Sequence, residues 1–416
     1  MLFVADRQVL NQPRKNVIGM SSPFEPLIIT ERKSLAGLCT RLAEAGSFAF
    51  DTEFVGEDSY HPEVCLIQVA THEFHALIDP IVGQLDLGCF WDLLIDPKIE
   101  ILVHAGSEDL SICYKQTGKC PTNLVDLQIA AGFCGMGHPI SLGRLVSQTL
   151  HQKVHKSQTL TDWRRRPFTN EQLTYAIEDV VYLPDAYKVI RGKVETLGRW
   201  DWVMEECEAL CASVASSSTD PEKPLRRMRG TASMSGRQLA LLAAILKQRE
   251  ELAVKNNRPA RAVIKDHLAI ELARRGWSDI EKMRSLRGLT ISNTDLRSIG
   301  QAIEAAKKLP PEAWPEMKVD DTPPEEDVLL AFITAVLRAH CDQIDLAYSL
   351  LSTRADIKKL IRATDMTDAS ADGSSLRRGW RAVAVGDLLT RVLSGDAAVR
   401  VIAKGGARKL VVEPGN

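Results

Sequence analysis

The stretch that decides the fold is residues 47–54, SFAFDTEF, where small, aromatic and acidic residues alternate as in a β-strand. Successive side chains of a strand point to opposite faces, so Asp51 and Glu53 share one face. Two carboxylates on one face of an apolar strand repel each other unless a cation lies between them. An isolated Asp-x-Glu pair is more often a solvent-facing strand end, so a functional interpretation needs partners elsewhere in the chain.

The segments that follow predict a mixed β-sheet. Residues 65–70 (CLIQVA) and 74–79 (FHALID) form a predicted hairpin, and residues 100–104 (EILVH) form a strand that leads into a helix near Ser107. From about Asp126 the apolar spacing becomes helical. We therefore expect an α/β fold in which helices cover a mixed sheet.

A third acidic residue lies at a predicted strand-to-helix junction. Ser107 can cap the helix, which places Asp109 in its first turn. A carboxylate there also favours the helix dipole, so taken alone Asp109 has a sufficient structural explanation.

A tyrosine and a fourth acid share one face of a later helix. Thr169 and Gln172 form a capping box that starts this helix near Asn170. Tyr175 and Asp179 are four residues apart on it, so their side chains are stacked on one face.

Taken together, the three acidic segments are far more specific than any one of them. Acid-x-acid on a strand, an acid at a strand-to-helix junction, and Tyr-x-x-x-acid on a later helix resemble the DEDDy branch of the DnaQ-like (RNase H-like) 3′–5′ exonucleases. The flanking segments resemble the ribonuclease D family: LIQ at 66–68, SL at 141–142, DWRRRPF at 162–168 and YLP at 182–184. The resemblance covers residues 26–215.

The resemblance implies two-metal-ion hydrolysis of a phosphodiester bond. Two divalent cations, Mg²⁺ or Mn²⁺, are hard ions that carboxylate oxygens suit. By the family pattern Asp51 bridges both metals, Glu53 and Asp179 complete the site that activates water, and Asp109 completes the site near the leaving group. Tyr175 holds the attacking water, an orienting role that its ordinary pKa of about 10 favours over deprotonation.

Candidate substrate contacts surround this set. They are Thr52, Phe54, Gln68, His104, Trp163, Arg164 and Arg166. The arginines suit phosphates and the tryptophan suits a stacked base. An equally good interpretation has Trp163 packing against the sheet while Arg164 or Arg166 pairs with acidic residues, and His104 supporting the site without binding metal.

Other sites have weaker support. His151 and His155 have helical spacing for a zinc pair but no third ligand nearby in sequence. Cys207 and Cys211 have the same spacing and are expected in the core. The chain holds no G-x-x-x-x-G-K-[ST] segment, so ATP hydrolysis is not indicated.

The formal net charge of −2 conceals three unequal blocks. Residues 1–221 carry 19 Lys and Arg against 29 Asp and Glu, a net of −10. Residues 222–310 carry 19 against 9, a net of +10, and residues 311–416 carry 14 against 16. A basic block of this kind suits sequence-independent binding of phosphates, although it could also be a solvated face that balances the acidic block.

Composition breaks divide the chain into three domains. We expect the exonuclease domain at 26–215, a Ser- and Pro-rich linker at 216–233, and a helical domain at 234–310 that resembles the HRDC domain. An acidic, Pro-rich linker follows at 311–326, and residues 327–416 resemble a diverged second HRDC domain. Both of these domains are expected to be small and all-α.

The ends and cysteines of the chain suggest where it acts. Residues 1–25 read as a disordered extension, with Met20 an alternative start, and no apolar run reaches the ~18 residues of a membrane span. Nine cysteines without a C-x-x-C pair suit buried thiols in a reducing compartment. We expect a cytoplasmic monomer without membrane contact.

The expected activity is a metal-dependent 3′–5′ exoribonuclease that trims RNA 3′ ends, such as those of tRNA precursors, and releases 5′-phosphomononucleotides. One alternative is the same chemistry on DNA, which the carboxylates do not distinguish. The other is a non-catalytic RNA-binding adaptor, which the clustered acids and Tyr175 disfavour because a pure binder gains nothing from buried carboxylates.

Overall fold

The structure is a computed structural model of the full chain. It describes residues 27–154, 162–217, 225, 228–315, 323–363, 373–404 and 407–414. The expected extension at 1–25 and His155 of the candidate zinc pair lie outside these residues.

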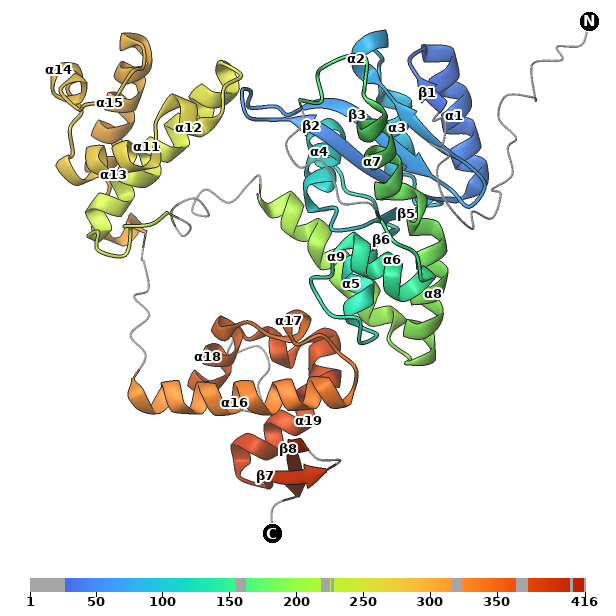
Figure 1. The fold of residues 1–416 in the computed structure, drawn as a ribbon. Coiled ribbons are helices and arrows are strands. Elements are labelled where there is room, and N and C mark those ends of the chain that lie inside the picture. Colours follow the sequence, from blue (N-terminus) through green and yellow to red (C-terminus); the bar gives the residue numbers. More distant parts are fainter. Residues whose placement is uncertain are drawn as a thin grey trace, which may run out of the picture.

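A six-stranded mixed sheet forms the centre of the N-terminal half (Figure 1). Its strands are β1 (Leu27–Ile29), β2 (Ser47–Val55), β3 (Glu63–Ala70), β4 (His75–Ile78), β5 (Glu100–Val103) and β6 (Leu124–Asp126). Their order is β1-β4-β3-β2-β5-β6, in which β3 runs antiparallel to both of its neighbours. The predicted hairpin and the strand before Ser107 are confirmed.

Helices cover both faces of this sheet. The helices of this half are α1 (Arg32–Ala45), α2 (Pro80–Gly83), α3 (Gly88–Leu94), α4 (Ser107–Thr117), α5 (Leu127–Gly132), α6 (Leu142–Leu150), α7 (Asn170–Val181), α8 (Leu183–Thr196) and α9 (Trp200–Ser217). Leu66 packs in a cluster with α7, and the next residue Ile67 packs in the main core with α1. Neighbouring strand residues face opposite ways, so α1 and α7 lie on opposite faces.

The start of α7 follows from its predicted capping box. The Thr169 hydroxyl accepts a hydrogen bond from the Gln172 backbone N–H (3.2 Å), and the Gln172 side chain accepts one from the Thr169 N–H (2.8 Å). This pair satisfies two of the helix's free N-terminal donors. The helix therefore begins at Asn170, as predicted, which sets the rotation of Tyr175 and Asp179 toward the sheet.

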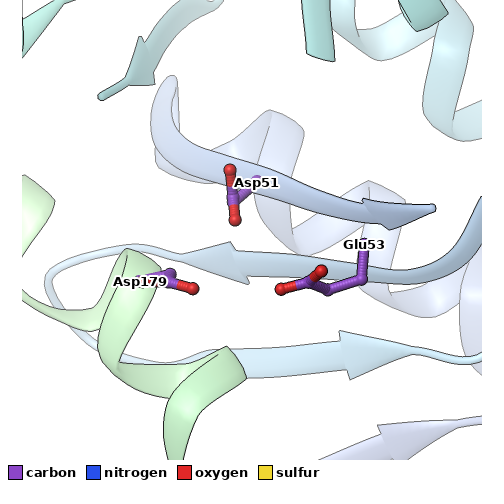
Figure 2. Close-up of side chains that lie close together, drawn as sticks. All are labelled: Asp51, Glu53 and Asp179. Carbon is purple, nitrogen blue, oxygen red and sulfur yellow. The ribbon is translucent and has the colours of Figure 1, made fainter. Parts of the chain in front are cut away.

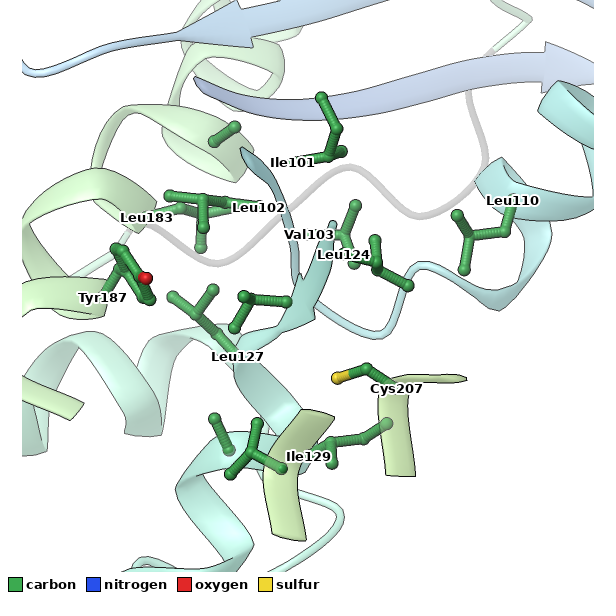
Figure 3. Close-up of a cluster of buried hydrophobic side chains, with 14 of the residues drawn as sticks. Ile101, Leu102, Val103, Leu110, Leu124, Leu127, Ile129, Leu183, Tyr187 and Cys207 are labelled. Atoms are coloured by element: carbon green, nitrogen blue, oxygen red, sulfur yellow. The ribbon is translucent and has the colours of Figure 1, made fainter. Parts of the chain in front are cut away.

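The far end of the sheet packs into a dense apolar layer (Figure 3). Ile101, Leu102 and Val103 of β5 and Leu124 of β6 lie among side chains from α4, α5, α8 and α9. Cys207 of α9 lies in this layer and is 1% exposed, which confirms the core role expected of it.

The basic region folds around a core of its own. Its helices are α11 (Gly236–Lys255), α12 (Ala260–Val263), α13 (Asp266–Arg275), α14 (Ile280–Arg284) and α15 (Asn293–Lys307). Leu225, which the sequence placed in the linker, is 1% exposed inside this core, so the packed unit begins earlier than predicted. The linker also starts later than the predicted residue 216, because α9 continues to Ser217.

The C-terminal region shares the main core with the sheet. Its elements are α16 (Pro324–Gln343), α17 (Tyr348–Leu351), α18 (Arg354–Arg362), α19 (Gly379–Ser394) and the strands β7 (Ala397–Lys404) and β8 (Ala407–Pro414). The β7–β8 hairpin was not predicted, and it follows an otherwise helical region. Among the described residues, no helix is both long and apolar enough to cross a bilayer.

Candidate active site

Three of the predicted acids converge over the middle of the sheet. Asp51 and Glu53 extend from β2, and Asp179 extends from α7, which packs on the same face of the sheet (Figure 2). One carboxylate oxygen from each lies within 4.8 Å of the others. This is the one metal-sized group of at least three acidic, histidine or cysteine ligands among the described residues.

Asp109 lies beside this group, and a residue of β2 fixes its side chain through a hydrogen bond. It is 6% exposed, and its carboxylate accepts a hydrogen bond from the Thr52 hydroxyl. Its charge raises the pKa of Asp51, Glu53 and Asp179, which places it in their electrostatic neighbourhood. Thr52, a candidate substrate contact, therefore uses its hydroxyl to position an acid.

Asp126 is a supporting residue that the sequence analysis did not single out. It is 3% exposed, and its carboxylate accepts hydrogen bonds from the backbone N–H groups of Ala105 (3.1 Å), Gly106 (3.1 Å) and Gln128 (2.8 Å). The first two belong to the turn that leads into α4, where Ala105 has a positive φ of 58°. Asp126 thus fixes the turn that presents Asp109.

Burial and mutual repulsion favour the protonated forms of these acids. Desolvation, followed by the charges of Asp179 and Asp109, raises the pKa of Glu53 to about 8. Desolvation also raises the pKa of Asp179 to about 7, although the hydrogen bond from Tyr175 opposes this shift. The pKa values of Asp51 and Asp109 are raised in the same way. Without cations, the cluster cannot be fully ionised at neutral pH.

The residues present fit divalent cations. Every ligand atom is a carboxylate oxygen, the donor that hard Mg²⁺ and Mn²⁺ prefer. The Oδ2 atom of Asp179 is buried and has no hydrogen-bond partner within the described part of the chain. A cation bound between these acids would satisfy that oxygen and remove the repulsion.

Tyr175 lies directly against the acid that shares its helix face. Its hydroxyl donates a hydrogen bond to Asp179, and burial together with the nearby carboxylates raises the pKa of the phenol far above its usual value. The phenol therefore stays neutral and acts as a hydrogen-bonding group at physiological pH.

Known proteins are similar to this chain in sequence and in fold. The 3′–5′ exonuclease domain family matches residues 26–195. Ribonuclease D of Gluconacetobacter diazotrophicus is 31% identical over 87% of this chain and 91% of its own. Ribonuclease D of Zymomonas mobilis is 33% identical over 90% and 95%.

The chain belongs to the ribonuclease D family. Among solved structures, Escherichia coli RNase D, described as an exoribonuclease involved in structured RNA processing, has a TM-score of 0.73 and 26% identity. The alignment covers 89% of this chain and 99% of the E. coli protein, so the likeness includes the helical regions. Membership of the ribonuclease D family makes this chain a hydrolase and a 3′–5′ exoribonuclease.

Two of the side chains predicted to contact RNA, Trp163 and Arg166, instead bind other residues within the protein. Trp163 is 6% exposed and packs against Tyr175, with ring centroids 6.0 Å apart. Arg166 forms two hydrogen bonds to the buried carboxylate of Asp79 (2.5 and 2.8 Å) and one to the Cys65 carbonyl (2.8 Å). The structure thus favours the internal-packing interpretation for both side chains.

The remaining candidates differ in accessibility. Arg164 is part-exposed and pairs with the surface acids Asp58 (3.2 Å) and Glu63 (3.0 Å). His104 donates from Nε2 to the Ile140 carbonyl (3.0 Å), and burial lowers its pKa, so it is neutral and supports the fold beside the site.

Among the described residues, His151 and Cys211 belong to no group of three or more possible metal ligands. His151 ends α6 with a positive φ of 55°. Cys211 hydrogen-bonds the Pro121 carbonyl (3.6 Å), as a packed helix residue. Phe54 packs part-buried against the main core.

The basic region of this ribonuclease D family member has an open hollow of about 500 Å³. Its lining residues are Arg229, Gly230, His267, Leu268, Ile270, Glu271, Arg274, Leu286 and Arg287. This lining includes three arginines and a histidine but one acid, Glu271, which pairs with Arg275 (2.5 Å). The hollow is thus a cationic surface that suits a polyanion.

Glu53 provides a test of the repulsion within the acid cluster. The pKa of Glu53 is about 8 in the folded protein and about 4.3 in the unfolded chain. Between these two pH values the folded state keeps a proton on Glu53 that the unfolded state has lost. This contribution to stability is complete below pH ~4 and lost as pH rises through 8. In EDTA, Glu53→Gln should therefore gain stability over the native protein between pH 5 and 8, by a few kcal/mol at ~1.4 kcal/mol per pKa unit. Calorimetric unfolding measures this, and parallel pH profiles of the two proteins would contradict it.

Proposed function

We propose that the acid cluster is the catalytic centre of a two-metal-ion 3′–5′ exoribonuclease, with Asp51, Glu53, Asp109 and Asp179 as metal ligands and Tyr175 as the fifth catalytic residue. The convergence of Asp51, Glu53 and Asp179 within 4.8 Å is the observation that carries this assignment. The metals are Mg²⁺ or Mn²⁺, because all donors are carboxylate oxygens. When bound, two such cations supply charge stabilisation to the attacking and leaving oxygens.

The protein's own groups position the reactants. Asp51, at the centre of β2, has the charges of Asp109, Asp179 and Glu53 close to it, and it would be a ligand of both cations. Glu53 and Asp179 would hold the cation that activates water. Asp109, which is held by Thr52 and by the turn that Asp126 fixes, would hold the cation near the leaving group. The neutral Tyr175 hydroxyl can orient an attacking water next to Asp179 while its ring rests on Trp163.

The proposed substrate is RNA with an accessible 3′ end, and the products are 5′-phosphomononucleotides. E. coli RNase D, to which this chain is similar, is described as acting in structured RNA processing. We extend this to precursors such as those of tRNA, in which a folded body carries a short single-stranded 3′ tail. The protein works as a cytoplasmic monomer in this proposal.

The helical regions have separate roles in this proposal. Residues 234–310, with Leu225 added, form an HRDC-type domain that binds the RNA body. Residues 327–416 form a diverged second HRDC-like domain that packs on the nuclease domain. The charge of +10 over residues 222–310 and the cationic hollow support the first role. The shared core supports the second.

Arg287 tests the binding role of the hollow. It is exposed and has no ion pair within the described part of the chain, so Arg287→Ala removes a cation without disturbing the core. RNA affinity should fall severalfold for all sequences alike, and the slope of log K against log salt should decrease by about 1. Fluorescence anisotropy at several salt concentrations measures both. Arg297→Ala, exposed on α15 outside the hollow, is the matched control, and equal losses in the two variants would contradict a specific role for the hollow.

Matched RNA and DNA oligomers separate the proposed function from the DNA alternative. Equal lengths and sequences with free 3′ ends, digested in Mg²⁺, should show RNA shortened faster than DNA. Preferential digestion of DNA would overturn the substrate assignment while leaving the chemistry intact.

A further inference from the structure

Gln68 lies in the row of side chains that contains Asp51. In the sheet register Asp51 of β2 pairs with Gln68 of β3, and Gln68 pairs with Leu77 of β4. Directly paired residues of antiparallel strands project from the same face, with Cβ atoms roughly 5 Å apart. Leu77 and the adjacent Leu66 pack in the cluster beneath α7, so this is the face that carries the acid cluster.

The Gln68 side chain is buried without a partner. It is 0% exposed, and neither its Oε1 nor its Nε2 atom has a hydrogen-bond partner among the residues that the structure describes. Leaving both ends of a buried amide unsatisfied costs free energy comparable to lost hydrogen bonds. An apolar side chain of the same length would avoid that cost, so the amide needs a function to explain it.

The side chains around the Gln68 amide indicate which group it can bind. At 0% exposure the Gln68 side chain presents no surface to RNA, so its nearest groups are those buried beside it. Its row neighbour on one side, Leu77, offers no polar atom, and its neighbour on the other side is the carboxylate of Asp51. Asp51 is therefore the polar group in this row that the amide can serve.

We propose that Gln68 is a positioning residue for Asp51: its amide N–H donates to the Asp51 carboxylate when that carboxylate binds metal, and so fixes its orientation. The inference rests on the proposed function, because it assigns Asp51 to the metal site. A donor placed behind a metal-binding carboxylate typically changes metal affinity about 10-fold or more when removed. A hydrogen bond from Gln68 to the metal-binding carboxylate would add to the stability that the protein gains on binding metal.

Gln68→Met tests this role, because methionine keeps the length of the side chain and removes its hydrogen-bonding atoms. Mn²⁺ binding to the full-length protein by isothermal titration calorimetry should weaken about 10-fold. The melting temperature in EDTA should stay the same or rise, whereas the gain in melting temperature on adding Mn²⁺ should shrink. Leu77→Met, its row neighbour, controls for repacking beneath α7 and should leave Mn²⁺ affinity unchanged.

The outcomes separate this inference from the proposed function. Asp51→Asn should lose most Mn²⁺ affinity; if it does not, the proposed function fails and the role of Gln68 fails with it. If Asp51→Asn loses affinity but Gln68→Met retains the native value, only the role of Gln68 is overturned. A lower melting temperature of Gln68→Met in EDTA would also overturn it, because that result indicates an amide with a purely structural partner.

Discussion

Asp51→Asn should abolish exonuclease activity while leaving the protein folded. The change removes one charge from the centre of the cluster and keeps the shape of the side chain, so packing around β2 is preserved. Loss of one preorganised electrostatic group at a reacting phosphate lowers turnover by roughly 10²–10³-fold, and a residue shared by two cations should lie at or beyond the upper end. The rate at which a 5′-labelled RNA is shortened in Mg²⁺ measures the loss.

The fold of this variant should be at least as stable as the native fold when metal is absent. Desolvation and three neighbouring acids raise the pKa of Asp51, so a neutral amide relieves repulsion that the native residue experiences as pH rises. Asp92→Asn, an exposed change on α3 of the same domain, should keep full activity. Native rates in Asp51→Asn would refute the catalytic assignment.

Trp380→Ala should cause the largest loss of stability. Trp380 of α19 is 1% exposed and stacks on Trp202 of α9, with ring centroids 5.5 Å apart, and lies edge-on to Phe133 at 4.8 Å. Its indole N–H donates to Glu206 (2.9 Å). Truncation of a buried aromatic residue costs about 3–5 kcal/mol through lost contacts and the cavity that remains.

The expected consequence is joint unfolding of the nuclease domain and the C-terminal region. Arg199, between α8 and α9, reinforces this interface by donating hydrogen bonds to the carbonyls of Phe133 (2.9 Å) and Ile344 (2.5 Å). In calorimetry, the nuclease domain and the C-terminal region should unfold in one shared transition, and the substitution should move that transition to lower temperature. The separate transition of the basic region should keep its temperature. Val383→Ala, 75% exposed on the same helix, is the control. A Trp380→Ala protein that loses only the C-terminal transition would contradict a shared core.

The acid cluster could be predicted because its signals are local. The alternation around Asp51 and Glu53 fixes their common face, and the capping box at Thr169 and Gln172 fixes the rotation of α7. Periods of 2.0 and 3.6 residues therefore decide which side chains face the site. The family resemblance then supplied the pairing of segments far apart in the chain, which periodicity alone does not determine.

The parts that could not be predicted depend on tertiary contacts. Asp126 looks like a simple strand end, and its three backbone hydrogen bonds appear only once β5 and β6 are paired. Trp163 and Arg166 have the composition of an RNA contact, but a buried partner acid, Asp79, takes the guanidinium. Leu225 lies in a Ser- and Pro-rich stretch and is buried because a helical core lies beside it.

The net charge of the chain is informative only when it is divided along the sequence. A net charge of −2 gives no indication of a polyanionic substrate. The block of −10 contains the acids proposed to bind cations, and the block of +10 contains the cationic hollow. Near-neutrality is therefore the sum of two opposite requirements of one nuclease.

The most direct test of the central claim is digestion of a 5′-labelled RNA with a single-stranded 3′ tail, with the 3′ end free or chemically blocked, in Mg²⁺ and in EDTA. Stepwise shortening from the free 3′ end in Mg²⁺, with no shortening of the blocked RNA or in EDTA, is the expected result. Internal cuts in the blocked RNA, or shortening that persists in EDTA, would contradict a metal-dependent 3′–5′ exonuclease centred on Asp51, Glu53 and Asp179.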